Sequence, residues 1–141
     1  MALFEILLYR DDGLSLIKVK EGGRTTERKI KPKLKALFNS EGLDITVEPA
    51  TQVTDYLDVK FNLATHTHEP FCKPNNSPSY INVNSDHPKH IIEHIPKMIA
   101  QRLSTLSSTE QIFEKNKAVY EKALQDSGYK CTLKYQKPNK T

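Results

Sequence analysis

The sequence contains no tryptophan, and only six tyrosines and five phenylalanines stand among its 141 residues. Charged residues make up 27% of the chain, and the mean hydropathy is negative. A large aromatic core is therefore excluded, and we expect a thin core with much polar surface. The length fits one domain or part of one.

Cysteines and long apolar runs are also scarce. Cys72 and Cys131 are far apart and have no paired-ligand spacing, so neither a disulfide framework nor a zinc ribbon is indicated. No stretch approaches the roughly 18 apolar residues that a membrane span needs. The start of the chain includes Glu5 and lacks the basic region of a signal peptide. We therefore expect an intracellular protein, cytoplasmic or nuclear, without membrane contact.

Positive charge is in mild excess. The formal net charge is +4, and basic residues gather in Lys18–Lys35 and again in Lys130–Lys140. Such clusters are typical of nucleic-acid-binding surfaces, but they also occur as solvated faces. The sequence leaves both interpretations open.

Two carboxylates lie between two apolar stretches near the start of the chain. Leu3–Leu8 and Leu14–Val19 flank residues 9–13, which read Tyr-Arg-Asp-Asp-Gly. This pattern predicts a β-hairpin whose reversal lies at Asp12-Gly13. Neighbouring carboxylates repel unless solvent, a basic group or a divalent cation neutralises them. The pair is either a magnesium site for phosphoryl transfer or an ordinary Asp-Gly turn with a solvated neighbour.

Hydrophobic spacing predicts the elements that follow. Apolar spacing within residues 24–39 predicts a helix in which Pro32 either lies in the first turn, after a start near Lys31, or kinks a longer helix; the later start is favoured. The helix is expected to end at residues 39–42. Alternating apolar residues predict half-buried strands over residues 44–48 and 57–63. The Pro- and Asn-rich segment 64–84 is expected to be a long connector with an extended piece at Tyr80–Val83.

The last third of the chain has helical spacing. Ser85 or Asp86 is expected to cap one helix, which Pro96 should bend or divide. A capping box at residues 107–110 predicts another helix that ends near Gly128. The tail is expected to be disordered or to form a short strand. The fold class is therefore α+β: a small antiparallel sheet with one covering helix, then a helical tail.

Four short segments follow one another along the chain: Tyr9-Arg10-Asp11-Asp12, Tyr56-Leu57-Asp58-Val59, Phe71-Cys72-Lys73-Pro74-Asn75-Asn76 and Asn84-Ser85-Asp86-His87-Pro88. Their order resembles the palm-to-thumb portion of reverse transcriptases from retroelements without long terminal repeats, most closely the Penelope-like type. The resemblance covers nearly the full chain. It implies a partial palm over residues 1–63 with primer-grip-like strands, a connector over 64–84, thumb-like helices over 85–128 and a basic tail over 129–141.

The resemblance also implies roles for single residues. Asp11 and Asp12 would be the catalytic residues and the ligands of Mg²⁺, and Tyr9 would pack beneath the nucleotide at the primer end. Lys73 and Lys89 would contact nucleic-acid phosphates, although Cys72 stands where relatives commonly carry an arginine. The partners would be an RNA template and a DNA primer, and exposed sheet edges could pair with another chain or another copy.

In this family a further aspartate comes from a strand upstream of the hairpin, and the sequence starts directly on the hairpin. We therefore expect the chain alone not to polymerise. Two alternatives stay open: a non-enzymatic remnant that binds nucleic acid, and a degenerate open reading frame with no function of its own.

Overall fold

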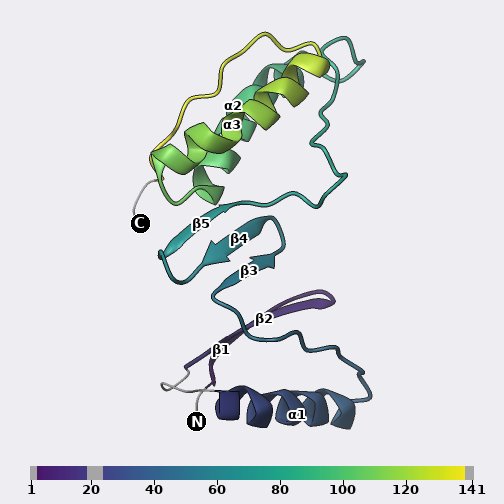
Figure 1. Cartoon of the computed structure of the whole chain (residues 1–141). Helices are drawn as coiled ribbons and strands as arrows, with labels where there is room; N and C mark the ends of the chain where they lie inside the picture. Colours follow the sequence, from purple (N-terminus) through teal and green to yellow (C-terminus); the bar gives the residue numbers. More distant parts are fainter. Residues whose placement is uncertain (1–2, 19–23, 139–141) are drawn as a thin grey trace. The chain divides into compact units, whose positions relative to one another are not determined.

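The computed structural model describes residues 3–18 and 24–138, and the chain divides into two compact units, Met1–Thr51 and Gln52–Thr141. The described part is α+β, as predicted, with two antiparallel sheets and three helices (Figure 1). The prediction of one sheet is wrong, because each unit has a sheet of its own. The two units divide after Thr51.

The first sheet is a hairpin of β1 (Leu3–Tyr9) and β2 (Asp12–Ile17). The hairpin is confirmed, but its reversal lies at residues 10 and 11 and not at Asp12-Gly13. The observed register pairs Leu7 with Leu14, whereas a reversal at Asp12-Gly13 would put Leu7 opposite Lys18. Apolar cross-strand pairs stabilise a sheet, so the apolar residues set the register. Val19, where the second strand was expected to end, lies outside the described residues.

Helix α1 (Arg24–Ser40) begins earlier than predicted and carries Pro32 in its interior. Proline removes one helical hydrogen bond, but Ile30, Leu34 and Phe38 continue a half-buried stripe past it. The Glu27 carboxylate also ties the first turn to the following loop, since it accepts the Ala50 N–H at 3.0 Å. These contacts explain why the helix begins before Pro32.

The end of α1 is as predicted. Gly42 has a φ of 76° and donates its N–H to the Asn39 carbonyl at 3.0 Å, and the Leu43 N–H reaches the Phe38 carbonyl at 3.0 Å. This pair of bonds is a Schellman motif, which needs a residue with positive φ. The strand predicted over residues 44–48 is absent, because no described strand pairs with that segment.

The second sheet has the order β3 (Val53–Tyr56), β4 (Val59–Asn62) and β5 (Thr67–Pro70), all antiparallel. The single strand predicted over residues 57–63 is wrong, because residues 57 and 58 form the turn between β3 and β4. Leu57 has a φ of 54°, which a hydrophobic pattern does not reveal. Strand β5 lies inside the segment that was expected to be a connector.

Two helices complete the second unit, α2 (Lys89–Leu106) and α3 (Glu110–Asp126). The cap predicted for α2 at Ser85 or Asp86 is wrong, because Pro88 stands at its N-cap. The cap of α3 lies within the predicted segment 107–110, where Thr109 accepts the Ile112 N–H at 3.3 Å. Pro96 lies inside α2 without dividing it. None of the helices in the described part of the chain combines the length and apolarity needed to cross a bilayer.

The segment after α3 is packed onto the helices, and the prediction of disorder or a short strand is wrong for residues 129–138 (Figure 1). The Leu133 side chain is 2% exposed, and its N–H donates to the Glu121 carboxylate at 2.8 Å. The Tyr129 hydroxyl donates to the Ile81 carbonyl at 2.8 Å. Residues 139–141 lie outside the described part. The core comprises Ile95, Ile99, Ala100, Leu103, Phe113, Leu124, Tyr129 and Leu133.

Gly128 ends α3 in a second Schellman motif, with a φ of 91°. A Cβ there would lie 2.6 Å from Val83 Cγ2. We predict that Gly128→Ala lowers the free energy of unfolding of the second unit by about 2–4 kcal/mol, from the left-handed backbone and the clash together. Urea unfolding followed by tyrosine fluorescence measures this, because five of the six tyrosines lie in that unit.

Gly42→Ala is the matched control. Gly42 also has a positive φ, but a Cβ there meets nothing within 4 Å, and the residue belongs to the first unit. The tyrosine-monitored midpoint should therefore stay in place. An equal shift for both variants would contradict the role of the Val83 contact.

Candidate functional site

The Tyr-Arg-Asp-Asp sequence surrounds the reversal of the β1–β2 hairpin. Tyr9 is the last residue of β1, Arg10 and Asp11 form the loop, and Asp12 opens β2 directly opposite Tyr9. Arg10 has a φ of 51°, which lets the chain reverse in two residues. The structure therefore brings Tyr9, Asp11 and Asp12 together at one exposed tip.

The guanidinium of Arg10 lies on an aromatic ring rather than on a carboxylate. Its central carbon is 5.5 Å from the centroid of the Tyr9 ring, within the range of a cation–π interaction. Tyr9 is 51% exposed, so the contact is open to solvent. No ion pair among the described residues involves Asp11 or Asp12, and both carboxylates are exposed.

Two accessible carboxylates can serve a hard divalent cation as part of its ligand shell. Mg²⁺ commonly keeps several waters and takes one or two protein carboxylates together with substrate phosphates. Within residues 3–18 and 24–138 the structure gathers no group of three or more His, Cys, Asp or Glu side chains. The tip therefore offers Asp11 and Asp12 as ligands, and a tightly held ion would need oxygens from a bound phosphate or from another segment.

Apolar side chains flank the tip on both faces of the hairpin. Leu8 is 65% exposed, and its Cδ2 atom would lie 3.2 Å from a Cβ at Gly13. Because neighbouring strand residues point to opposite faces, both faces carry exposed apolar groups. Such surface on two strands indicates a face that another element or chain can cover. The exposed members are Ile6, Leu7, Leu8 and Leu16.

The two lysines expected to contact phosphates belong to the second unit. Lys73 is exposed, and its backbone carbonyl accepts the Asn76 N–H at 3.0 Å, which closes a turn. Lys89 is the exposed first residue of α2. A cation at a helix N-terminus is unfavourable for the helix dipole, so Lys89 does not stabilise α2 by its position. The two residues come from separate segments of this unit.

Asp58 is a residue whose position the sequence prediction missed. It lies in the β3–β4 turn, where its carboxylate pairs with Arg102 of α2 and its carbonyl accepts the Phe71 N–H at 2.7 Å. Both charged side chains are exposed, so the pair adds little stability. A signal was present: Tyr-Leu-Asp repeats the Tyr-Arg-Asp of the first hairpin, and in each the residue after tyrosine has a positive φ.

A second missed feature joins Cys72 to Tyr120 of α3. The Cys72 Sγ atom lies 3.7 Å from the Tyr120 hydroxyl. Burial, followed by this hydrogen bond, raises the pKa of Tyr120 well above its ordinary value, and burial also raises the pKa of Tyr80. These hydroxyls therefore stay protonated near neutral pH. They can donate hydrogen bonds, but they do not supply a base.

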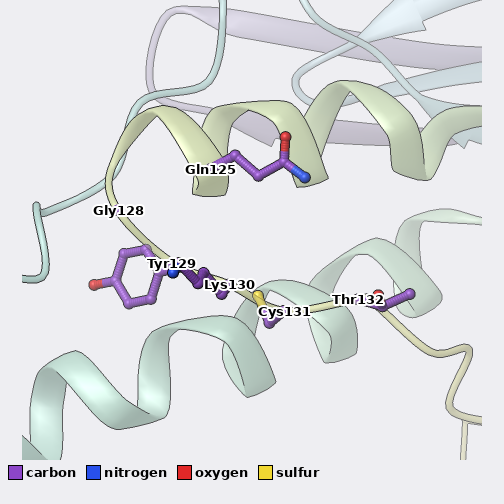
Figure 2. A pocket seen from close by; sticks show the side chains of 6 residues that line it. All are labelled: Gln125, Gly128, Tyr129, Lys130, Cys131 and Thr132. Atoms are coloured by element: carbon purple, nitrogen blue, oxygen red, sulfur yellow. The ribbon is translucent and has the colours of Figure 1, made fainter.

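An open pocket of about 550 Å³ lies where α3 ends (Figure 2). It contains Cys131, whose pKa is raised by burial and by the charge of Glu121. The thiol is therefore poorly suited to act as a nucleophile. Figure 2 shows that the lining comes from the last turn of α3 and the extended segment after it: Gln125, Gly128, Tyr129, Lys130, Cys131 and Thr132.

Tyr120 makes the stability of the second unit depend on alkaline pH. Its folded-state pKa lies above the unfolded value near 10, so the stabilisation is complete below pH 10 and is lost as the pH rises beyond it. We predict that the free energy of unfolding measured with urea falls above pH 10. Loss of the Tyr120 proton contributes at most about 1.4 kcal/mol per pH unit to the slope of this fall.

Tyr120→Phe should reduce that slope, because phenylalanine has no proton to lose. Tyr9→Phe, which changes an exposed tyrosine of the first unit, should leave it unchanged. The same slope in the Tyr120→Phe variant and the unmodified chain would show that burial of this hydroxyl has no energetic effect.

The function has to be argued from the motifs and geometry described above, because no protein-family model, no curated protein and no solved structure matches this chain.

Proposed function

We propose that the chain is the palm-and-thumb part of an RNA-directed DNA polymerase of a retroelement, with the β1–β2 tip as its metal-binding element. The observation that carries this proposal is the position of Tyr-x-Asp-Asp around a two-residue reversal in an exposed hairpin. A random Asp-Asp pair on a helix or in a long loop would not have this geometry. The motif order along the chain gives further support.

In this proposal the carboxylates of Asp11 and Asp12 would supply the protein oxygens that hold Mg²⁺. Asp12 shares the hairpin face of Tyr9, whereas Asp11 stands in the loop, so the two carboxylates approach an ion from different parts of the turn. Bound Mg²⁺ would stabilise the charge on the attacking and leaving oxygens. The primer 3′-hydroxyl would lose its proton to solvent and form a bond to the α-phosphorus, while the bond from that phosphorus to pyrophosphate breaks.

Tyr9 would support the sugar and base of the primer-end nucleotide. Its ring is half exposed and already carries the Arg10 guanidinium on one side. Aromatic rings stack on nucleotide bases of any sequence, which suits a polymerase that must accept all four. Arg10 beside the ring would add a positive charge near the triphosphate.

The second unit would act as the thumb-like part. Its paired helices α2 and α3 follow a small sheet, and the exposed Lys73 and Lys89 can contact phosphates from a turn and a helix start. Phosphate contacts position a duplex without reading its sequence. The uncovered apolar faces of the β1–β2 hairpin suit a strand pair that packs against further elements of a polymerase palm.

Manganese titration with backbone NMR tests the metal site. Mn²⁺ replaces Mg²⁺ at oxygen sites and broadens the signals of nearby amides. We predict broadening centred on residues 9–13, which is lost in the Asp11→Asn and Asp12→Asn double variant because no carboxylate remains at the tip. Inorganic pyrophosphate should strengthen the effect, since it supplies the phosphate oxygens that the two aspartates leave open.

Asp55→Asn is the control, because Asp55 is an exposed aspartate of β3 without a neighbouring carboxylate in the sequence. It should leave the broadening at residues 9–13 unaltered. A folded protein whose tip signals do not respond to Mn²⁺ would contradict the proposed site. The Asp pair would then serve only the turn, and the non-enzymatic alternative would take the place of the polymerase.

A further inference from the structure

Helix α1 carries the net positive charge of this protein. Its residues include six basic side chains and one acid, whereas the rest of the chain has fifteen basic and sixteen acidic residues. The net charge of +4 is therefore concentrated in 17 of the 141 residues. Concentrated charge creates a strong local field, whereas evenly spread charge does not.

The basic residues form two rows along α1. At 100° per residue, Arg28, Lys31 and Lys35 lie along one side of the basic face, and Lys29 and Lys33 along the other. Pro32 and Ala36 fall between the rows, and both are small and exposed. The basic face therefore has a proline and an alanine, and no cation, between its two rows of cations.

These cations are available to a partner. Arg28, Lys29, Lys33 and Lys35 are exposed, and no ion pair within residues 3–18 and 24–138 engages them. The one acid of the helix, Glu27, already accepts the Ala50 N–H. In the second unit, by contrast, the ion pairs use Arg102, Lys115 and Lys117. Helix α1 thus presents basic side chains that no ion pair among the described residues engages.

The opposite side of the helix argues against a lipid surface as the partner. A helix that binds membranes inserts its apolar side chains between the lipids. In α1, Ile30, Leu34 and Phe38 are half-buried, and Leu37 is the one large apolar residue of the helix that is exposed, at 59%. No large apolar residue stands between the basic rows. A linear polyanion needs no insertion, and its phosphates can lie along the two rows of cations.

We propose that the basic face of α1 binds the phosphate backbone of single-stranded nucleic acid without reading its sequence. From Arg28 to Lys35 the rows extend about 10 Å, which matches about three phosphates of a strand. The binding is electrostatic and weakens with salt. The proposal does not rest on the polymerase assignment, because no residue of the β1–β2 tip takes part.

Fluorescence anisotropy with a labelled oligo(dT) tests the proposal in the full chain. The test variant is Lys29→Gln, Lys33→Gln and Lys35→Gln, since glutamine keeps a similar helix propensity and removes only the charge. Its plot of log affinity against log salt should be shallower than that of the unmodified chain by about 2, which is the loss of three phosphate contacts to a single strand. Far-UV circular dichroism checks that both proteins contain the same helix.

The control variant removes the same number of charges from the second unit, through Lys97→Gln, Lys122→Gln and Lys130→Gln. These lysines are exposed and also have no ion pair among the described residues. The control should keep the full salt slope, and Lys→Arg at the three α1 positions should keep it as well.

Equal loss in the test and control variants would overturn the proposal in favour of net charge alone. Absence of oligo(dT) binding, or tighter binding to phosphatidylserine vesicles than to oligo(dT), would also overturn it. Asp11→Asn with Asp12→Asn should keep the salt slope of the unmodified chain, because it removes no cation that contacts a phosphate. Failure of the manganese test and failure of the α1 test can therefore be told apart.

Discussion

Burial of Phe113 is the interaction on which the second unit depends. Its side chain is 0% exposed and packs in one cluster with residues of α2, α3 and the segment after α3. The Phe113 and Tyr135 rings pack in a T-shaped arrangement with a centroid distance of 5.5 Å. Because the chain has few aromatic residues, the packing of α2, α3 and the segment after α3 depends strongly on this one phenylalanine. The ordered tail is a consequence, because without it the core would lie open to water.

The sheet of this unit is joined to the helices by polar contacts rather than by the core. His68 and Ser108 exchange two hydrogen bonds, at 3.0 and 3.1 Å, and the His68 Nδ1 atom lies 2.9 Å from the Leu106 carbonyl. A carbonyl can only accept, so Nδ1 carries the proton in this contact. Lys115 and Glu69 add an ion pair at 3.2 Å. The sheet is thus fixed at the junction of α2 and α3, where both helices leave backbone groups to be satisfied.

Hydrophobic periodicity, together with the residues that favour turns and helix ends, made the helices and the first hairpin predictable from the sequence. Apolar spacing located all three helices, and Gly42 and Gly128 marked two helix ends because only glycine easily adopts the positive φ that a Schellman motif needs. The reversals were missed for the same reason. Arg10 and Leu57 adopt a positive φ although neither is a glycine. For Arg10, the need for a positive φ becomes apparent only when Leu7 is paired with Leu14 across the first hairpin. The tail was missed because Leu133 and Tyr135 stand among lysines, and their burial depends on a core formed by distant residues.

The first 51 residues separate charge by element. Outside α1 they contain three basic and seven acidic residues, whereas α1 contains six basic residues and one acid. A chain with no function for this separation would gain by mixing the signs, because ion pairs along a helix face each add a few tenths of a kcal/mol. The acidic tip of the hairpin suits a cation, and the helix suits a polyanion. Nucleotide phosphates with Mg²⁺ are a ligand class that needs both kinds of surface, so the two proposals concern different residues but lead to the same chemistry.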